Sequence, residues 1–353
     1  MKYALLLMTT LSLTACANNS SHVDRPLLVN DKDKLSSELQ KERPHYKYSY
    51  ANEPKVQKFI RMMVEKHNYD ESLLQAAFAS IKTRKKSIKK SNNQPEVIAP
   101  YYQYRKHFLE IDRIKAGRDF SQKYKSWLNK AEKEFGVPAD IIVALIGVET
   151  FYGRVMGNID VFTSLSTLAF DYPRRTRYFQ SELEAYLLLV RDNEWPIGKA
   201  KGSYSGALGM GQFMPSNYRK LAIDYDNNGV VDLWSSVPDA IGSVGRYLQH
   251  HGWQQGKTPV ISVKVDNTQK SKWKSHINEG RSPIKYLPEW HSIGVAENVK
   301  EKQEKTGLIA LRTANKVTSY WLANKNFFVI MRYNPSRRYS MAVLELAKEI
   351  SSE

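Results

Sequence analysis

Cysteine is almost absent from this chain, because Cys16 is the only one among 353 residues. An internal disulfide is therefore excluded. Long apolar runs are also scarce: the run from Ala4 to Leu13 is too short to span a bilayer, and no second candidate follows it. The sequence shows no internal repeat. The length of 353 residues is enough for one large domain or two to three small ones, with a sizeable core.

Acidic side chains are few compared with basic ones. The chain has 36 Asp and Glu against 53 Lys and Arg, which gives a net charge of +17. A surface of this charge attracts polyanions such as nucleic acid, anionic lipid headgroups or an acidic cell-wall polymer. No DNA- or RNA-binding signature accompanies the charge, so the charge alone does not identify the polyanion.

The first residues predict export. Lys2 precedes the apolar run, and small residues stand directly before Cys16, which is typical of a secretory signal peptide over residues 1–15. The ending Leu-Thr-Ala-Cys resembles a bacterial lipobox, in which the peptide is cut before the cysteine and the thiol is lipidated. Ala17, not Asp, follows, which by the sorting rule for such proteins predicts an outer-membrane lipoprotein facing the periplasm. The alternative is a plain signal peptide with a chance cysteine. Export argues against nucleic acid as a partner.

Hydropathy patterns divide the rest of the chain. We expect a flexible tether over residues 16–50 and an α domain with a helical core over 51–252. A small β-containing region follows over 253–333, and a C-terminal segment over 334–353 returns to the core. Alternation at 260–265 and strand-like runs at 306–312 and 318–333, with a turn at 324–326, support the β-containing region. The predicted fold is mainly α, of the α+β class.

The segment from Pro138 to Gly153 predicts a helix with one misplaced charge. Pro138 suits the first helical position and Gly153 suits a stop. Glu149 lies four residues after Leu145 and therefore on the apolar face. Apolar surroundings make a carboxyl group harder to ionise, which a general acid acting on an ether oxygen requires. The alternative is a glutamate at a helix end that reaches solvent or pairs with Arg154.

Residues 202–215 are too rich in glycine for the interior of a helix or strand. The glycines allow the backbone to lie close to another helix or to a ligand. Ser203 and Gln212 supply polar groups that can orient a sugar. The alternative is a purely structural loop.

Residues 224–239 contain the first half of an EF-hand-like calcium loop. Oxygen ligands at the first, third and fifth places and a backbone carbonyl at the seventh come from Asp224, Asp226, Asn228 and Val230. Ser235 stands where the standard loop has a bidentate glutamate, and Asp239 is the nearest later carboxylate that can close the shell. The alternatives are a structural Ca²⁺ site and a turn without metal.

Taken together, these pieces resemble the membrane-bound lytic murein transglycosylase B family. The matching segments are GVETFYGRVMG, DYPRRTRYF, KGSYSGALGMGQFMPSNYRKLAIDYDNNGVVDLW, VPDAIGSVGRYLQHHGW and RYNPSRRYSMAVLELA, in family order. The resemblance spans about Tyr101 to the end. It implies a lysozyme-like helical core, flanked by an α domain and a small β-containing domain. It also implies cleavage of the MurNAc–GlcNAc β-1,4 bond of peptidoglycan, with a 1,6-anhydroMurNAc end, Glu149 as general acid and then base, and no cofactor for the chemistry.

The resemblance also implies a set of substrate contacts. They are Tyr104, Ser203, Gln212, Phe213, Tyr247, Tyr333, Asn334 and Tyr339. Aromatic rings can stack on pyranose faces, and amides and hydroxyls can fix acetamido groups and ring hydroxyls. The family's calcium loop matches at Asp224, Asp226 and Asn228, with one extra residue before Asp239. The basic surface then has a partner in the carboxylates of peptidoglycan stem peptides, and cell-wall synthesis enzymes are further candidate partners.

Two other functions stay open at this point. A hydrolytic muramidase would use the same acid on the same bond and would leave reducing ends. A non-catalytic wall-binding lipoprotein would hold glycan in the groove without cutting it.

Overall fold

The computed structural model describes residues 49–82, 88, 99–296, 299 and 304–352. The predicted signal peptide, Cys16 and the tether as far as residue 48 lie outside these residues. Within the described part of the chain, no helix combines the length and the apolar character needed to cross a membrane.

Two amphipathic helices open the described chain, α2 (Pro54–His67) and α3 (Glu71–Ala79). Their apolar faces meet at Phe59 and Phe78, whose ring centroids lie 6.1 Å apart. Both rings also contact Phe170, at 5.6 and 6.1 Å. Phe170 belongs to α10 (Val161–Asp171), so the N-terminal helices are joined to the main core.

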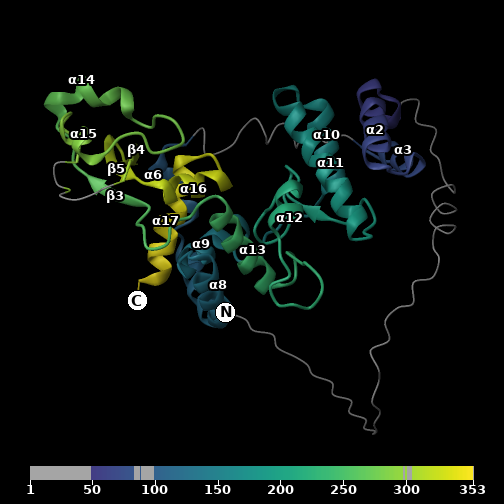
Figure 1. The fold of residues 1–353 in the computed structure, drawn as a ribbon, viewed down its shortest axis with the longest axis horizontal. Coiled ribbons are helices and arrows are strands. Elements are labelled where there is room, and N and C mark those ends of the chain that lie inside the picture. Colours follow the sequence, from purple (N-terminus) through teal and green to yellow (C-terminus); the bar gives the residue numbers. More distant parts are fainter. Residues whose placement is uncertain (1–48, 83–87, 89–98, 297–298, 300–303, 353) are drawn as a thin grey trace, which may run out of the picture. The chain divides into compact units, whose positions relative to one another are not determined.

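A buried helix, α9 (Ala139–Thr150), lies at the centre of the helical core. It packs against α7 (Ile111–Lys123), α8 (Lys125–Phe135), α13 (Val237–His250) and α17 (Arg337–Ser351), and Figure 1 labels α8, α13 and α17 around it. Every residue from 141 to 147 is buried, as expected of a helix that is apolar on all sides. The sequence placed the ends of this helix inexactly. Pro138 caps the helix from outside, and Phe151, in the left-handed conformation at φ 51°, ends it two residues before Gly153.

The remaining helices of the core surround the glycine-rich loop. They are α10, α11 (Thr176–Asp192) and α12 (Pro215–Leu221), and α11 packs against both of the others. A short antiparallel pair, β1 (Ile159–Asp160) and β2 (Lys201–Gly202), precedes the loop. Pro215 begins α12, because its missing N–H is not needed at a first helical position.

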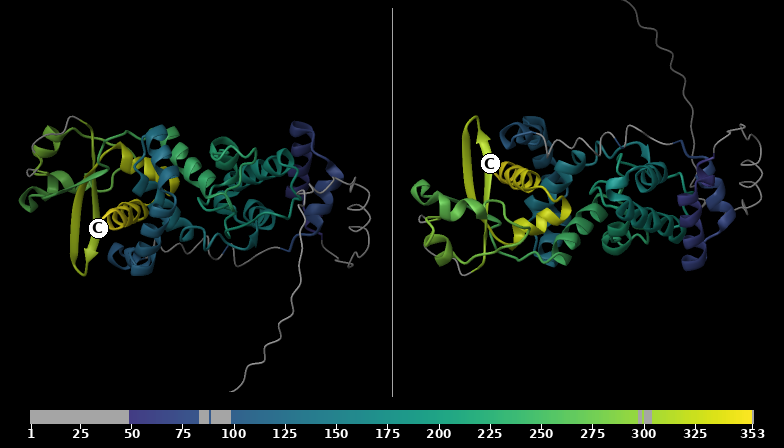
Figure 2. Two further views of the ribbon diagram at one scale, coloured as in Figure 1. Left: turned by 90° about the horizontal axis from the view of Figure 1, so that it is seen from below. Right: turned by 90° about the horizontal axis from the view of Figure 1, so that it is seen from above.

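A three-stranded antiparallel sheet forms the β-containing part, in the order β3 (Val260–Val263), β5 (Val317–Ala323), β4 (Gly307–Ala314). Figure 2 shows the yellow-green hairpin of β4 and β5 in two further views. Short helices accompany the sheet, α14 (Lys270–Trp273) and α15 (Leu287–His291). Each contributes a fully buried tryptophan, Trp273 and Trp290, to the apolar cluster of the sheet.

One predicted strand is a helix. The strand-like run at 318–333 ends as a strand at Ala323, and α16 (Lys325–Tyr333) follows it. Asn324 begins the helix, because its side-chain oxygen accepts the Asn326 N–H at 2.9 Å. A continuous apolar run does not distinguish a buried strand from a buried helix, and residues 327–331 are all buried.

The shorter helical segments complete the fold. They are α6 (Tyr101–Tyr104) and 3-10 helices at Tyr50–Asn52, Arg105–His107, Pro173–Arg175, Asn267–Gln269 and Lys274–His276. The prediction of a mainly helical fold with a small sheet is confirmed.

Candidate active site

Glu149 is the last residue but one of α9, and it is half-buried. The helix stops abruptly there, because Phe151 and Tyr152 both adopt left-handed backbone conformations, at φ 51° and 59°. The Tyr152 ring folds back onto Gly147, where a Cβ atom would lie 2.6 Å from it. The Tyr152 hydroxyl donates to the Arg113 carbonyl at 3.0 Å. The turn after Glu149 is thus fixed by a glycine and by a bond to another helix.

Thr150 connects the end of α9 to the glycine-rich loop. Its hydroxyl, in a side chain that is 1% exposed, donates to the Met210 carbonyl at 2.8 Å. The same oxygen accepts the Gly153 N–H at 3.0 Å. These two hydrogen bonds of Thr150 therefore fix the glycine-rich loop relative to the end of α9, where Glu149 lies.

Tyr339, from α17, is the hydrogen-bond donor to Glu149. Its hydroxyl donates to Oε1 of Glu149 over 2.5 Å. Burial, followed by the negative charge of Glu149, raises the pKa of Tyr339 well above its usual range. The phenol consequently stays protonated through neutral pH and remains a donor to the carboxylate.

Three aromatic rings pack beside this pair. Phe213, Tyr247 and Tyr333 form a triangle with ring centroids 4.7 to 5.9 Å apart. The Tyr333 hydroxyl donates to the Gly211 carbonyl over 2.5 Å, and that of Tyr247 donates to the Arg332 carbonyl over 2.7 Å. Burial and then the charge of Glu149 raise the pKa of Tyr333. The rings of Phe213, Tyr247 and Tyr339 are nearly fully buried, so they form a wall of the site rather than open stacking platforms.

The polar residues predicted from the loop, Gln212 and Ser203, bind groups of the loop and of the segment after α9. Gln212, at φ 48°, directs its side-chain N–H groups to the carbonyls of Gly209 at 2.9 Å and Met156 at 3.2 Å. The Ser203 hydroxyl accepts the Ala207 N–H at 3.0 Å and lies 3.1 Å from the Ser205 hydroxyl. These bonds hold the loop in shape at both ends.

Two further predicted contacts lie close to Tyr339 and Tyr333. Tyr104, from α6, is buried in the cluster that joins α6, α16 and α17, and its phenol adds to the rise in the pKa of Tyr339. Asn334 follows Tyr333 directly and ends α16. The structure thus gathers Glu149 and aromatic residues from several distant segments at one place.

The predicted calcium loop brings three carboxylates together. One oxygen each from Asp224, Asp226 and Asp239 lies within 4.8 Å of the other two. Asp239 is fully buried in the first turn of α13, and burial raises its pKa. Its two oxygens accept the N–H groups of Tyr225 at 2.7 Å and Asp232 at 2.8 Å. Three convergent carboxylate oxygens, one of them buried, fit a hard cation that prefers oxygen ligands.

The other two predicted ligands, Asn228 and Val230, lie in the same turn. The side-chain oxygen of Asn228 accepts the Val230 N–H at 2.9 Å. Asp224 accepts the N–H groups of Asn228 at 3.0 Å and Gly229 at 2.7 Å. Gly229 has φ 90°, a conformation that other residues rarely adopt, which accounts for glycine at the sixth place of the loop.

The comparisons with known proteins decide the family. A family model described as "Transglycosylase SLT domain" matches residues 51–348. The chain is also 35% identical over 317 residues to the membrane-bound lytic murein transglycosylase B of Escherichia coli, covering 86% of this chain and 84% of that protein. The chain belongs to the lytic murein transglycosylases.

Solved structures agree with this assignment. The E. coli lytic transglycosylase Slt35 in complex with calcium matches with a TM-score of 0.75 and 35% identity, over 86% of this chain and 94% of that one. SltB3 from Pseudomonas aeruginosa in complex with NAG-anhNAM-pentapeptide matches with a TM-score of 0.72 and 28% identity, over 85% and 80%. The family, the enzyme class and the lysozyme-like fold predicted from the sequence are confirmed.

Sequence reasoning missed Glu182 of this transglycosylase, a buried carboxylate that fixes the start of α12, directly after the glycine-rich loop. Glu182 lies on α11, is 4% exposed, and accepts the Ser216 N–H at 3.0 Å and the Ser216 hydroxyl at 2.8 Å. It therefore caps α12, which starts directly after the loop. Burial raises the pKa of Glu182. The signal was available, because Glu182 stands between Phe179 and Leu183 on an apolar face, as Glu149 does on α9.

Proposed function

We propose that this transglycosylase cuts the MurNAc–GlcNAc β-1,4 bond of peptidoglycan without water and leaves a 1,6-anhydroMurNAc end. The observation that carries the proposal is the half-buried Glu149 carboxyl group held by the Tyr339 hydroxyl at 2.5 Å. The SltB3 complex adds support, since the ligand named with that relative contains an anhydro sugar.

Glu149 acts twice in the proposed reaction. It first gives its proton to the glycosidic oxygen, the bond from C1 of MurNAc to that oxygen breaks, and GlcNAc leaves with a 4-hydroxyl group. The positive charge at C1 is relieved by the acetamido group of the substrate or by nearby dipoles. The Glu149 carboxylate then takes the proton of the C6 hydroxyl as O6 bonds to C1. The residue ends protonated, as it began.

A single carboxylate is consistent with the surroundings. Retaining glycosidases place a second carboxyl group about 5 to 5.5 Å from the first. The charge of Glu149 raises the pKa of Tyr247, Tyr333 and Tyr339, so all three phenols lie around this one carboxylate. This supports a scheme in which O6 of the substrate replaces an enzyme nucleophile.

The predicted contacts take two roles in this scheme. The buried rings of Phe213, Tyr247 and Tyr339 keep water from the side of Glu149 that faces the core. Hydroxyl and amide groups for the sugars come from Ser203, Gln212 and Asn334. The Tyr104 phenol lies close to Tyr339 and helps to keep its hydroxyl protonated.

The product distinguishes this reaction from hydrolysis. Digestion of purified sacculi is expected to give glycan ends that are lighter by one water than reducing MurNAc, because O6 and not water attacks C1. Mass spectrometry of the released fragments measures this directly. Reducing ends alone would identify a hydrolytic muramidase instead.

Calcium is proposed as a structural ligand of the Asp224–Asp239 loop, with no part in the chemistry. The convergent carboxylates and the calcium complex of Slt35 support it. A cation that binds only the folded state raises the melting temperature, by about 2–5 °C at millimolar calcium relative to chelator. Asp224→Asn is the matched variant: it removes the charge of one ligand and should reduce the calcium shift, while its side-chain oxygen can still accept a backbone N–H of the loop. The same melting temperature with calcium and with chelator would mean that the loop is only a turn.

The location of the enzyme is proposed from the N-terminus. A lipid on Cys16 would hold it at the outer membrane, facing the periplasm. The membrane-bound relative from E. coli supports attachment to a membrane.

A further inference from the structure

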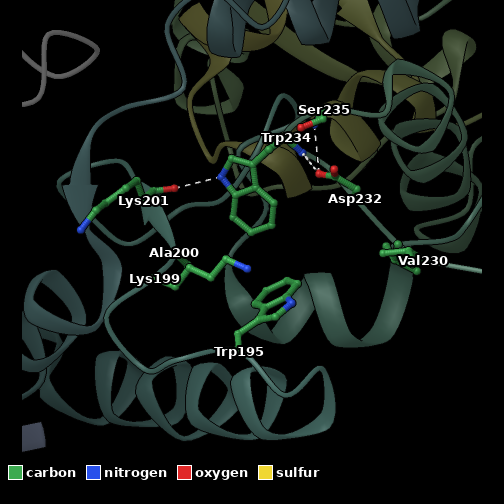
Figure 3. A pocket seen from close by; sticks show the side chains of 9 residues that line it. Trp195, Lys199, Ala200, Lys201, Val230, Asp232, Trp234 and Ser235 are labelled. Atoms are coloured by element: carbon green, nitrogen blue, oxygen red, sulfur yellow. Dashed lines mark hydrogen bonds between the residues drawn. The ribbon is translucent and has the colours of Figure 1, made fainter. Parts of the chain in front are cut away.

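A cavity of about 440 Å³ lies outside the residues assigned to the Glu149 site (Figure 3). Its lining includes Trp195, Lys199, Lys201, Asp232, Trp234 and Ser235. None of these is a predicted substrate contact. The chain runs from Lys201 to Ser203 in two residues, so the cavity adjoins the glycine-rich loop.

Two tryptophans form the aromatic walls of this cavity. The rings of Trp195 and Trp234 are half-buried, with centroids 5.6 Å apart and planes at 76°. Tyr218 packs behind both, at 6.3 and 5.8 Å. The indole N–H of Trp234 donates to the Lys201 carbonyl at 3.0 Å, which fixes the ring. The indoles are therefore partly open to solvent and already held in place, as rings that bind a ligand should be.

The cavity contains one ammonium group that makes no ion pair with the described residues. Lys199 is exposed, and its ammonium group makes no hydrogen bond or ion pair with any residue that the structure describes. Figure 3 shows its side chain beside the two indole rings, among the residues that line the cavity. Lys201 differs, because its ammonium lies 3.7 Å from the Asp160 carboxylate and 3.3 Å from the Gly198 carbonyl.

Asp232 also lines the cavity, but its carboxylate makes no ion pair with Lys199. Its Oδ1 atom accepts the backbone N–H groups of Trp234 at 2.8 Å and Ser235 at 3.0 Å. Its own N–H donates to Asp239 at 2.8 Å, which ties this wall to the buried end of α13. The Asp232 carboxylate thus holds the turn that contains Trp234. The cavity combines two fixed indole rings with the unpaired ammonium group of Lys199.

We infer that this cavity binds a MurNAc–stem-peptide unit of peptidoglycan, an amino sugar whose attached peptide carries carboxylates. The apolar face of the pyranose ring packs on the indoles, and the carboxylate pairs with Lys199. The inference rests on the proposed function, since it takes peptidoglycan as the polymer. A second attachment on the same enzyme raises the affinity for the polymer more than for a short fragment, because the two contacts act on one chain.

Binding to intact sacculi tests the inference. In the inactive Glu149→Gln background, Lys199→Glu is expected to weaken binding about five- to tenfold at physiological salt. Lys58→Glu makes the same change in charge at an exposed site on α2 and should leave binding within about twofold, because separated surface charges are screened. Lys199 is exposed, so its replacement does not endanger folding. Equal affinities for the Lys199→Glu and Lys58→Glu variants would overturn the inference.

Two soluble ligands test the chemistry of the contact. Calorimetry with a disaccharide–tetrapeptide should show weaker binding by Lys199→Glu. Chitotetraose has no carboxylate, and its affinity should not depend on Lys199. The same loss with both ligands would contradict a carboxylate contact. In the otherwise wild-type enzyme, anhydro ends in the products would still support the proposed function, so the two proposals can fail separately.

Discussion

Replacement of Glu149 by glutamine is expected to lower the turnover of peptidoglycan by about three orders of magnitude or more, because one side chain supplies both the acid and the base. Glutamine has nearly the same size as glutamate, and its oxygen can still accept the Tyr339 hydroxyl. The amide can neither give the proton to the glycosidic oxygen nor take one from the C6 hydroxyl. Release of soluble muropeptides from sacculi measures the loss.

The same variant separates an enzyme from a glycan-binding lipoprotein. Its melting temperature and its binding to sacculi should stay close to those of the parent protein. Glu65→Gln, the same change at an exposed position of α2, should leave turnover unchanged. Undiminished product release by Glu149→Gln would refute the role of this residue and would require another acid.

The sequence alone identified Glu149 but not what holds it. Its position on the apolar face of α9 was visible from spacing, whereas Tyr339, the donor, is 190 residues away in the chain. The same anomaly at Glu182 has a structural outcome, since both of its oxygens are bound by Ser216. Helical spacing shows that a carboxylate faces the core, but only the tertiary fold shows which groups meet it.

The limits of sequence reasoning on the fold have a similar cause. Periodicity located the long helices because their apolar residues recur at helical spacing. It failed at α16, because the continuous apolar run over residues 327–331 is consistent with a buried strand as well as with a helix. The convergence of Asp224 and Asp226 with Asp239 was predictable because loop and helix are close in sequence. The cavity between Trp195 and Trp234 was not, because nothing in either local sequence predicts their contact.

Tyr339→Phe is expected to lower turnover by about 10- to 100-fold, because a hydrogen bond to a charged group contributes about 1.5–3 kcal/mol. The variant keeps the buried ring and removes only the hydroxyl that donates to Glu149 at 2.5 Å. A donor to a carboxylate favours the charged form, so its loss makes the proton harder to remove. Since the first step needs the protonated acid, the alkaline limb of kcat/KM against pH should move to higher pH.

Tyr333→Phe is the matched control for this prediction. It also removes a buried phenolic hydroxyl near Glu149, but that hydroxyl donates to the Gly211 carbonyl and not to the carboxylate. We expect lower activity through a looser loop, with the alkaline limb in its original place. The phenol of Tyr339 does not itself titrate in this range, because its pKa is raised well above its usual range. A limb that shifts equally in both variants, or in neither, would show that Tyr339 supports the fold and does not control the protonation of Glu149.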